Sequence, residues 1–238
     1  MTGYLRLPPM HNIITAMSRL TTYCISEIAA RLDEPFSMAS IAYVDDLLVS
    51  VYICEGRLDW HRHVDFDELF WVHEGAMMLE SERGHVRLGA GEMAVVPKGT
   101  KHRSKSSDRA IVVLLRCGLM PHRKNGKRQL YVTDEAGLPS LDARKTANGL
   151  VAPFRFQTVA HVEDSKVQLA RGSGRWPVEL PVAHDRMIYV IDGVLTVRTV
   201  RNRLRLTSGD FTVVPRGAFY HLHTEDNTLL ARVTREAL

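Results

Sequence analysis

An internal repeat limits the fold of this chain more than any other feature of its 238 residues. When the sequence is shifted against itself by 118 residues, four turn-forming residues fall on identical residues: Gly75 on Gly193, Gly91 on Gly209, Pro97 on Pro215 and Gly99 on Gly217. The apolar runs also match, because AVVPKG at 94–99 falls on TVVPRG at 212–217, and the match has no gap across at least 25 positions. The pattern indicates a tandem duplication of one unit.

The spacing of the turns predicts that each unit is built from β-strands. Short alternating segments are separated by turn signals about every eight to twelve residues, which is typical of antiparallel barrels and jelly rolls rather than βαβ folds. Helix is scarce, and Ile25–Leu32 is the best short candidate. We therefore predict an all-β chain with two barrels in tandem.

Histidine and glutamate residues cluster in the first unit. Alternate residues of a strand point to one face, so His61 and His63 can aim both imidazoles at one point if this segment is a strand. Glu68 is an odd number of residues from both histidines, so we expect a turn at 64–67 before it. Glu68 then begins a new strand, which a hairpin at Gly75 closes. This carboxylate joins the two imidazoles from a neighbouring strand.

A fourth candidate ligand follows the apolar strand that starts at Gly91. This strand ends in the turn Pro97-Lys98-Gly99, and the chain re-enters the sheet with His102. Three imidazoles and one carboxylate leave two positions open on an octahedral ion, which suits Fe(II), Mn(II), Co(II) or Ni(II), whereas catalytic zinc usually keeps three protein ligands. We expect one divalent transition metal per chain (Fe, Mn, Ni, Co or Zn), bound by His61, His63, Glu68 and His102.

Written as patterns, these segments read H-x-H-x4-E-x6-G and G-x5-P-x-G-x2-H, and they resemble the paired motifs of the cupin superfamily. The resemblance runs roughly from Thr22 to Arg116 and includes 32–37 and Asp67–Phe70. It implies double-stranded β-helix (jelly-roll) barrels and places the metal ligands of the family on the same four residues. Together with the repeat it implies a bicupin with four parts: an N-terminal extension at 1–21, a metal-binding barrel at 22–118, a linker at 119–153 and a degenerate second barrel at 154–238.

The second unit lacks the candidate ligands of the first. The shift by 118 residues pairs each ligand with a different residue: His61 with Glu179, His63 with Pro181, Glu68 with Arg186 and His102 with Tyr220. A fixed cation disfavours a metal and favours an anion, so Arg186 is a candidate anion site. A shifted metal site at His184, His221 and His223 is an alternative, and a purely structural role for the second barrel is another.

Composition and charge favour a cytoplasmic protein. Apolar residues make up 45% of the chain, no apolar run reaches the ~20 residues of a membrane helix, and the N-terminus lacks the pattern of a signal peptide. The net charge of +4 and the absence of a nucleic-acid motif favour reading the basic run at 121–128 as part of a solvated linker. We expect a small-molecule substrate, no nucleic-acid or membrane partner, and a homodimer as a candidate assembly.

Strand parity predicts the lining of a largely apolar pocket next to the metal, made by Tyr52, Phe70, Val72 and Ser104, with Cys54 added if it faces inward. His73 and His85 lie outside the motifs, and we expect them on the surface. The resemblance to cupins permits several chemistries, because fold alone does not select one.

The first functional hypothesis is a metal-dependent oxidoreductase of the dioxygenase type that acts on a small organic substrate, because an open metal site with an apolar lining suits this chemistry. The alternatives are a sugar or sugar-acid isomerase or lyase, which would be indifferent to O2, and a non-catalytic ligand-binding cupin.

Overall fold

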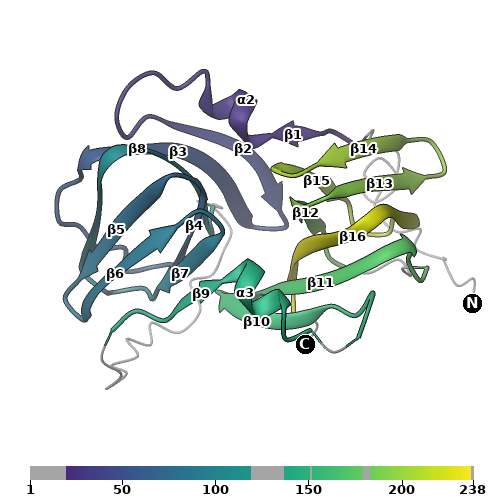
Figure 1. The fold of residues 1–238 in the computed structure, drawn as a ribbon. Helices are drawn as coiled ribbons and strands as arrows, with labels where there is room; N and C mark the ends of the chain where they lie inside the picture. The colour runs from purple at the N-terminus through teal and green to yellow at the C-terminus, as the bar shows by residue number, and fades with distance from the viewer. Residues whose placement is uncertain (1–19, 119–136, 151, 179–182, 237–238) are drawn as a thin grey trace, which may run out of the picture.

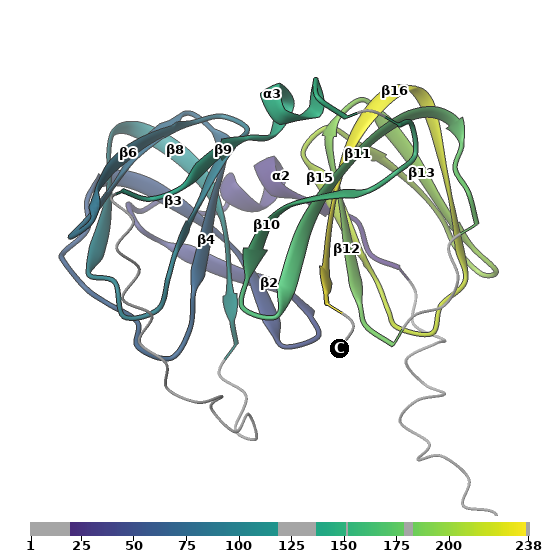
Figure 2. The same ribbon diagram turned by 90° about the horizontal axis from the view of Figure 1, so that it is seen from below.

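The computed structural model describes residues 20–118, 137–150, 152–178 and 183–236. These residues form two eight-stranded antiparallel sheets, one for each barrel, which lie side by side (Figures 1 and 2). Two short helices, α2 (Ile25–Ala29) and α3 (Ala143–Ala147), accompany the strands of the described residues. The prediction of an all-β chain with two barrels in tandem and little helix is confirmed. The basic run at 121–128, Glu179 and Pro181 lie outside the described residues.

The strands follow one another in two sets of eight. The first set is β1 (Tyr23–Cys24), β2 (Met38–Val44), β3 (Leu47–Arg57), β4 (Glu68–Glu74), β5 (Ala76–Ser81), β6 (Gly84–Gly89), β7 (Glu92–Val96) and β8 (His102–Cys117). The second set is β9 (Ser140–Asp142), β10 (Gln157–Val162), β11 (Ser165–Arg175), β12 (Arg186–Asp192), β13 (Val194–Thr199), β14 (Arg203–Thr207), β15 (Asp210–Val214) and β16 (Tyr220–Arg235). A shift of 118 residues superposes β3 on β11, β4 on β12, β7 on β15 and β8 on β16 residue for residue.

The backbone repeats as faithfully as the strands do. Among the described residues, four non-glycine residues have positive φ angles, and they form two repeat-related pairs: Phe36 (59°) with Phe154 (63°), and Asp45 (55°) with Glu163 (51°). Left-handed conformations are unfavourable for such residues, so their recurrence shows that the turns before β2 and β3 keep the same shape before β10 and β11. The duplication thus extends well beyond the positions on which the sequence prediction was based.

Each half gives its first strand to the other barrel. β1 pairs with β15 of the second barrel, with Cys24 opposite Asp210, and β9 pairs with β7 of the first barrel, with Asp142 opposite Glu92. These contacts are reciprocal, because the two pairs differ by the same 118 residues. The predicted segments 22–118 and 119–153 therefore each carry a strand that hydrogen-bonds to the sheet of the other half. The sequence analysis did not anticipate this exchange.

Three apolar clusters account for the packing of the described residues. Two of them fill the barrels, around Phe70 and Val112 in the first and around Val190 and Leu222 in the second. The third lies between the barrels, where the outer faces of the two sheets meet and Trp71 packs edge-on against Tyr189 with ring centroids 5.0 Å apart. Burial of apolar surface on both faces of β4 fixes this strand from both sides. No helix among the described residues is long and apolar enough to cross a membrane.

His73 lies in the interface between the barrels, so its predicted surface position was wrong, whereas His85 is exposed as expected. The Nδ1 atom of His73 lies 3.0 Å from the Tyr189 hydroxyl, and its Nε2 atom lies 3.0 Å from the Ser26 hydroxyl. Gly209 leaves room for the ring, because a Cβ atom there would lie 2.7 Å from Cε1 of His73. Contact between the barrels, which has no local sequence signal, explains the difference.

Protonation of His73 should weaken the fold. Burial lowers the pKa of His73 below its ordinary value of 6.5, although Glu74 and Asp210 oppose the shift. The unfolded chain therefore binds more protons than the folded one, so the contribution of this residue is present above pH 6.5 and is lost as the pH falls below it. We expect His73→Gln to flatten the dependence of the unfolding free energy on pH between about 7 and 5. Urea titrations across this range measure it. The exposed His85→Gln variant is the control, and an equal flattening in both variants would contradict the interpretation.

Candidate metal centre

The four predicted ligands lie at one end of the first barrel and come from three segments. Glu68 is the first residue of β4, and His102 is the first residue of β8. His61 and His63 lie in the connection between β3 and β4, where the predicted regular strand was wrong: only an isolated bridge joins His61 to His102. The backbone forms this bridge through His61 N–H to His102 O at 3.0 Å and His102 N–H to His61 O at 2.9 Å. β3 ends at Arg57, before the two histidines, so neither of them belongs to a regular strand.

The turn before His102 holds the loop that carries His63. The amide of Gly99 donates to the carbonyl of His63 at 2.6 Å, and Gly99 has a φ of 84°, which glycine adopts without strain. The Pro97-Lys98-Gly99 turn of the motif therefore binds the backbone of the loop that carries His63. The turn and the His61–His102 bridge together fix both loop histidines against the start of β8.

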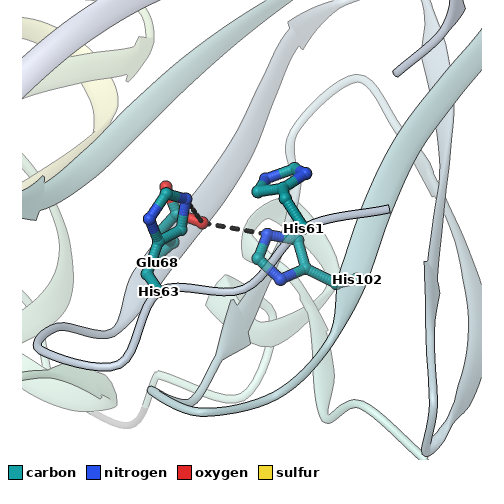
Figure 3. A group of neighbouring side chains, drawn as sticks. All are labelled: His61, His63, Glu68 and His102. Atoms are coloured by element: carbon teal, nitrogen blue, oxygen red, sulfur yellow. Dashed lines mark ion pairs between the residues drawn. The ribbon is translucent and has the colours of Figure 1, made fainter. Parts of the chain in front are cut away.

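The structure brings all four predicted ligands together. One ligand atom from each of His61, His63, Glu68 and His102 can be chosen so that all lie within 4.8 Å of one another. Figure 3 shows the Glu68 carboxylate between two imidazoles, with Oε2 at 3.0 Å from Nε2 of His102 and at 3.4 Å from Nε2 of His63. The His61 ring lies beside that of His102, with centroids 4.4 Å apart. This size of cluster matches the first coordination sphere of one ion.

Backbone carbonyls orient two of the imidazoles. Nδ1 of His61 lies 2.8 Å from the Asp59 carbonyl, and Nδ1 of His102 lies 3.0 Å from the Thr100 carbonyl. A carbonyl only accepts hydrogen bonds, so each Nδ1 must carry the proton. In the neutral rings Nε2 then presents its lone pair to the cluster, which is the arrangement found in metal-ligating histidines. Sequence reasoning missed both carbonyls, although each belongs to the residue two positions before its histidine.

Burial separates two polar atoms of the cluster from water. Glu68 is 3% exposed and His102 is 1% exposed, and neither Glu68 Oε2 nor His102 Nε2 has a hydrogen-bond partner among the described residues. Two buried lone pairs facing each other at 3.0 Å require a proton or a cation between them. Burial also lowers the pKa of His63, against the opposing effect of Glu68, and so favours the neutral imidazole that binds metals. The donor set therefore fits one divalent transition-metal ion.

The barrel interior closes the inner side of the cluster. Phe70 meets His102 edge-on with ring centroids 5.9 Å apart, and Tyr52, Val72 and Ser104 are also buried on the interior side. Cys54 faces inward as well, and burial raises the pKa of its thiol to about 11, so it stays a thiol at neutral pH. The role of the four predicted residues in lining a substrate pocket stays a prediction.

The outer side of the cluster reaches solvent. The His63 side chain is 28% exposed, and Phe66 stacks on its ring with centroids 4.6 Å apart. The guanidinium of Arg116 lies over the Phe66 ring, 5.7 Å from its centroid. Phe66 and Arg116 were not singled out from the sequence, because their contacts depend on the ligand loop folding back over β8.

The second barrel carries a different pair at the matching positions. Arg186 donates from NH1 to the Tyr220 hydroxyl at 2.7 Å, in a buried contact that replaces the Glu68–His102 pair. The guanidinium is thus engaged within the barrel, and the anion site predicted at Arg186 stays a prediction. The alternative metal site is not formed among the described residues: His184 pairs with Asp45 at 3.4 Å, while His221 and His223 flank the inward-facing Leu222.

Two tandem jelly-roll barrels with a three-histidine, one-glutamate cluster in the first define a bicupin. A family model described as a cupin domain matches residues 51–115. The protein YdbB of Bacillus subtilis is 36% identical over 85 residues, which cover 35% of this chain and 75% of YdbB. The chain belongs to the cupin superfamily.

Solved structures resemble the whole fold. The cupin 2 conserved barrel domain protein of Leptotrichia buccalis has a TM-score of 0.70 at 7% identity and covers 91% of this chain and 96% of its own. The salicylate 1,2-dioxygenase of Pseudaminobacter salicylatoxidans has a TM-score of 0.71 at 14% identity, with 92% of this chain and 85% of its own covered. At these identities the likeness concerns the fold of both barrels together.

Proposed function

We propose that this protein is a metal-dependent oxidoreductase of the dioxygenase type that acts on a small organic acid. The observation that carries the proposal is the buried Glu68–His102 pair, whose facing lone pairs call for a proton or a cation, with His61 and His63 completing a donor set that suits a metal ion. When bound there, a redox-active ion would supply Lewis-acid and electron-transfer chemistry at positions left open to small molecules. The four side chains would hold it.

The remaining residues of the site would position the substrate. Glu68 and His102 close the inner side, so a substrate would approach from the partly exposed side of His61 and His63. Phe70 and Phe66 offer aromatic surface on either side of the imidazoles, at 5.9 Å from His102 and 4.6 Å from His63. Apolar walls of this kind favour a small, flat, organic molecule over a strongly hydrated one.

Arg116 supports an acidic substrate. Arg116 lies opposite Glu68 in the pairing of β4 with β8, and it is on the same face of β8 as the inward-facing Val112 and Leu114. Its side chain contacts the Phe66 ring and makes no hydrogen bond or ion pair with other side chains of the described residues. A guanidinium beside a ligand cluster is suited to bind a carboxylate in two parallel hydrogen bonds. One of the fold relatives, salicylate 1,2-dioxygenase, has been solved in complex with gentisate, an aromatic acid.

Oxygen consumption tests the proposal. Metal-free protein is loaded with Fe(II) under anaerobic conditions and then mixed with O2 and either gentisate, salicylate, catechol or an enediol. We expect O2 uptake in proportion to substrate loss with at least one acid, and we expect Arg116→Met to raise KM for the acid by about tenfold or more while leaving a neutral analogue unaffected.

Two outcomes would contradict the proposal. Conversion of substrate at the same rate without O2 would indicate isomerase or lyase chemistry. Saturable binding of the acid without any turnover by the Fe(II)-loaded protein would indicate a ligand-binding cupin.

A further inference from the structure

We propose that Glu163, in the turn between β10 and β11 of the second barrel, is a positioning residue for the metal ligands of the first barrel. The inference rests on the proposed metal site. Although the second barrel lacks the ligand set, it reaches the loop that precedes Glu68 through this turn. The geometry thus assigns the second barrel a part in building the site, besides covering one face of the first barrel.

Glu163 and Asp67 form a reciprocal pair of hydrogen bonds across the interface between the barrels. The amide of Asp67 donates to Oε1 of Glu163 at 2.7 Å, and the amide of Glu163 donates to Oδ2 of Asp67 at 3.2 Å. The second carboxylate oxygen of Glu163 lies 3.8 Å from Nζ of Lys98, and the Glu163 side chain is only 9% exposed. Hydrogen bonds to ionised acceptors that are shielded from water are among the stronger ones in proteins. We call this arrangement the Glu163 clasp.

The Glu163 clasp connects to the segments that carry three of the four ligands. Asp67 immediately precedes Glu68, and its Oδ1 accepts a hydrogen bond from the amide of Lys98 at 2.8 Å. Lys98 lies in the turn whose next residue, Gly99, donates to the carbonyl of His63 at 2.6 Å. The same turn leads into His102. One carboxylate of the second barrel therefore holds the start of β4 and, through Asp67, the turn that fixes His63 and His102.

The repeat-related contact between the barrels shows what is particular to Glu163. At the repeat-related position, Asp45 donates its amide to Oδ2 of Asp185 at 3.2 Å, and the amide of Arg216 donates to Oδ1 of Asp185 at 2.8 Å. The Asp45 carboxylate, which is one methylene shorter, pairs with His184 at 3.4 Å. We call this the Asp45 clasp. It holds the end of the second barrel that carries Arg186 in place of a metal ligand.

Both clasp residues have the left-handed backbone, with φ of 51° at Glu163 and 55° at Asp45. Such strain persists in a non-glycine residue only where surrounding contacts hold it. Because both turns have this backbone, the strain is common to the two repeats and does not distinguish them. The two positions differ in side-chain length, since the metal-site side has Glu163 and the other side has Asp45. They therefore form a matched pair for experiment.

The affinity for Co(II) and the 15N NMR signals of the histidine rings together test the inference in the full-length protein. The variants are Glu163→Ala, Glu163→Gln and the matched control Asp45→Ala. Co(II) titration gives Kd, 15N NMR of the histidine rings is recorded on the metal-free protein, and urea titration shows that each variant folds. We expect Glu163→Ala to raise the Kd for Co(II) by about 10- to 100-fold, the range known for residues that orient metal ligands. Glu163→Gln, which keeps an acceptor for the Asp67 amide, should recover most of the affinity, and Asp45→Ala should match the wild type.

The ring resonances separate this inference from the proposed function. We expect Glu163→Ala to shift or broaden the 15N signals of His63 and His102 without metal, and Asp45→Ala to leave them unchanged. Unchanged signals in Glu163→Ala, or equal shifts in Kd for the two alanine variants, would overturn the inference even if the wild type binds Co(II) tightly. A wild type that binds no Co(II) would refute the proposed function, whereas the ring signals would still decide whether Glu163 positions these side chains.

Discussion

The double variant Glu68→Ala, His102→Ala should lose metal binding almost completely. These residues are the two buried members of the donor set, with 3% and 1% of their surfaces exposed, and no other acidic or imidazole group of the described residues completes the cluster. Loss of a residue that only hydrogen-bonds to a metal ligand costs about 10- to 100-fold in metal affinity. Loss of two ligands themselves should therefore cost more than about 1,000-fold. Titration with Co(II) or Mn(II) measures the change.

The second barrel supplies the control for this prediction. Arg186→Ala, Tyr220→Ala replaces the two residues at the matching positions, which are joined by a buried hydrogen bond of 2.7 Å. It should leave the metal stoichiometry and the Kd of the first barrel unchanged, although it disturbs a buried contact of similar depth. Equal losses of metal in both double variants would mean that the effect is general unfolding. Wild-type affinity in the first double variant would mean that the metal binds elsewhere.

Trp71→Ala should be among the most destabilising single substitutions in the chain. Trp71 is 2% exposed in the apolar cluster between the barrels and packs on Tyr189 at 5.0 Å. Truncation of a buried aromatic side chain removes apolar burial and leaves a cavity, at a cost of about 3–5 kcal/mol. Urea unfolding followed by circular dichroism measures the loss.

A second tryptophan serves as the matched control. Trp60 is 39% exposed and stacks with the guanidinium of Arg103 at 4.6 Å. Trp60→Ala should cost no more than about 1 kcal/mol, because exposed cation–π contacts are weak. If Trp71→Ala costs no more than Trp60→Ala, the two barrels do not depend on the cluster between them, and the structure of this interface is contradicted.

Local patterns predicted the barrels well and their mutual arrangement poorly. Glycine and proline turns mark the ends of strands, so the repeat at Gly75 and Gly193 fixed where hairpins occur, and the strands follow. By contrast, the pairing of β1 with β15 joins opposite ends of the chain. Nothing within a few residues of Cys24 encodes such a partner. The half-buried position of His73 between the barrels is missed for the same reason.

In the candidate site, too, the sequence predicted what local patterns determine and missed what depends on tertiary contacts. Motif spacing identified four residues that the fold does bring within 4.8 Å, because each lies beside a turn that the sequence marks clearly. It placed His61 and His63 on a strand because parity alone cannot show that β3 stops at Arg57. The contact of Glu163 with Asp67 crosses the interface between the barrels, so no spacing rule could have suggested it. The homodimer and the cytoplasmic location stay predictions.

Elemental analysis of the full-length protein, purified without a chelating column, tests the central claim most directly. We expect about one transition-metal ion per chain, because one four-residue donor set is present in the described residues. Iron as that ion would agree with the proposed oxygen chemistry. Less than about a tenth of an ion per chain, both as purified and after anaerobic reconstitution with Fe(II), Mn(II), Ni(II), Co(II) and Zn(II), would contradict the claim that this cluster is a metal site.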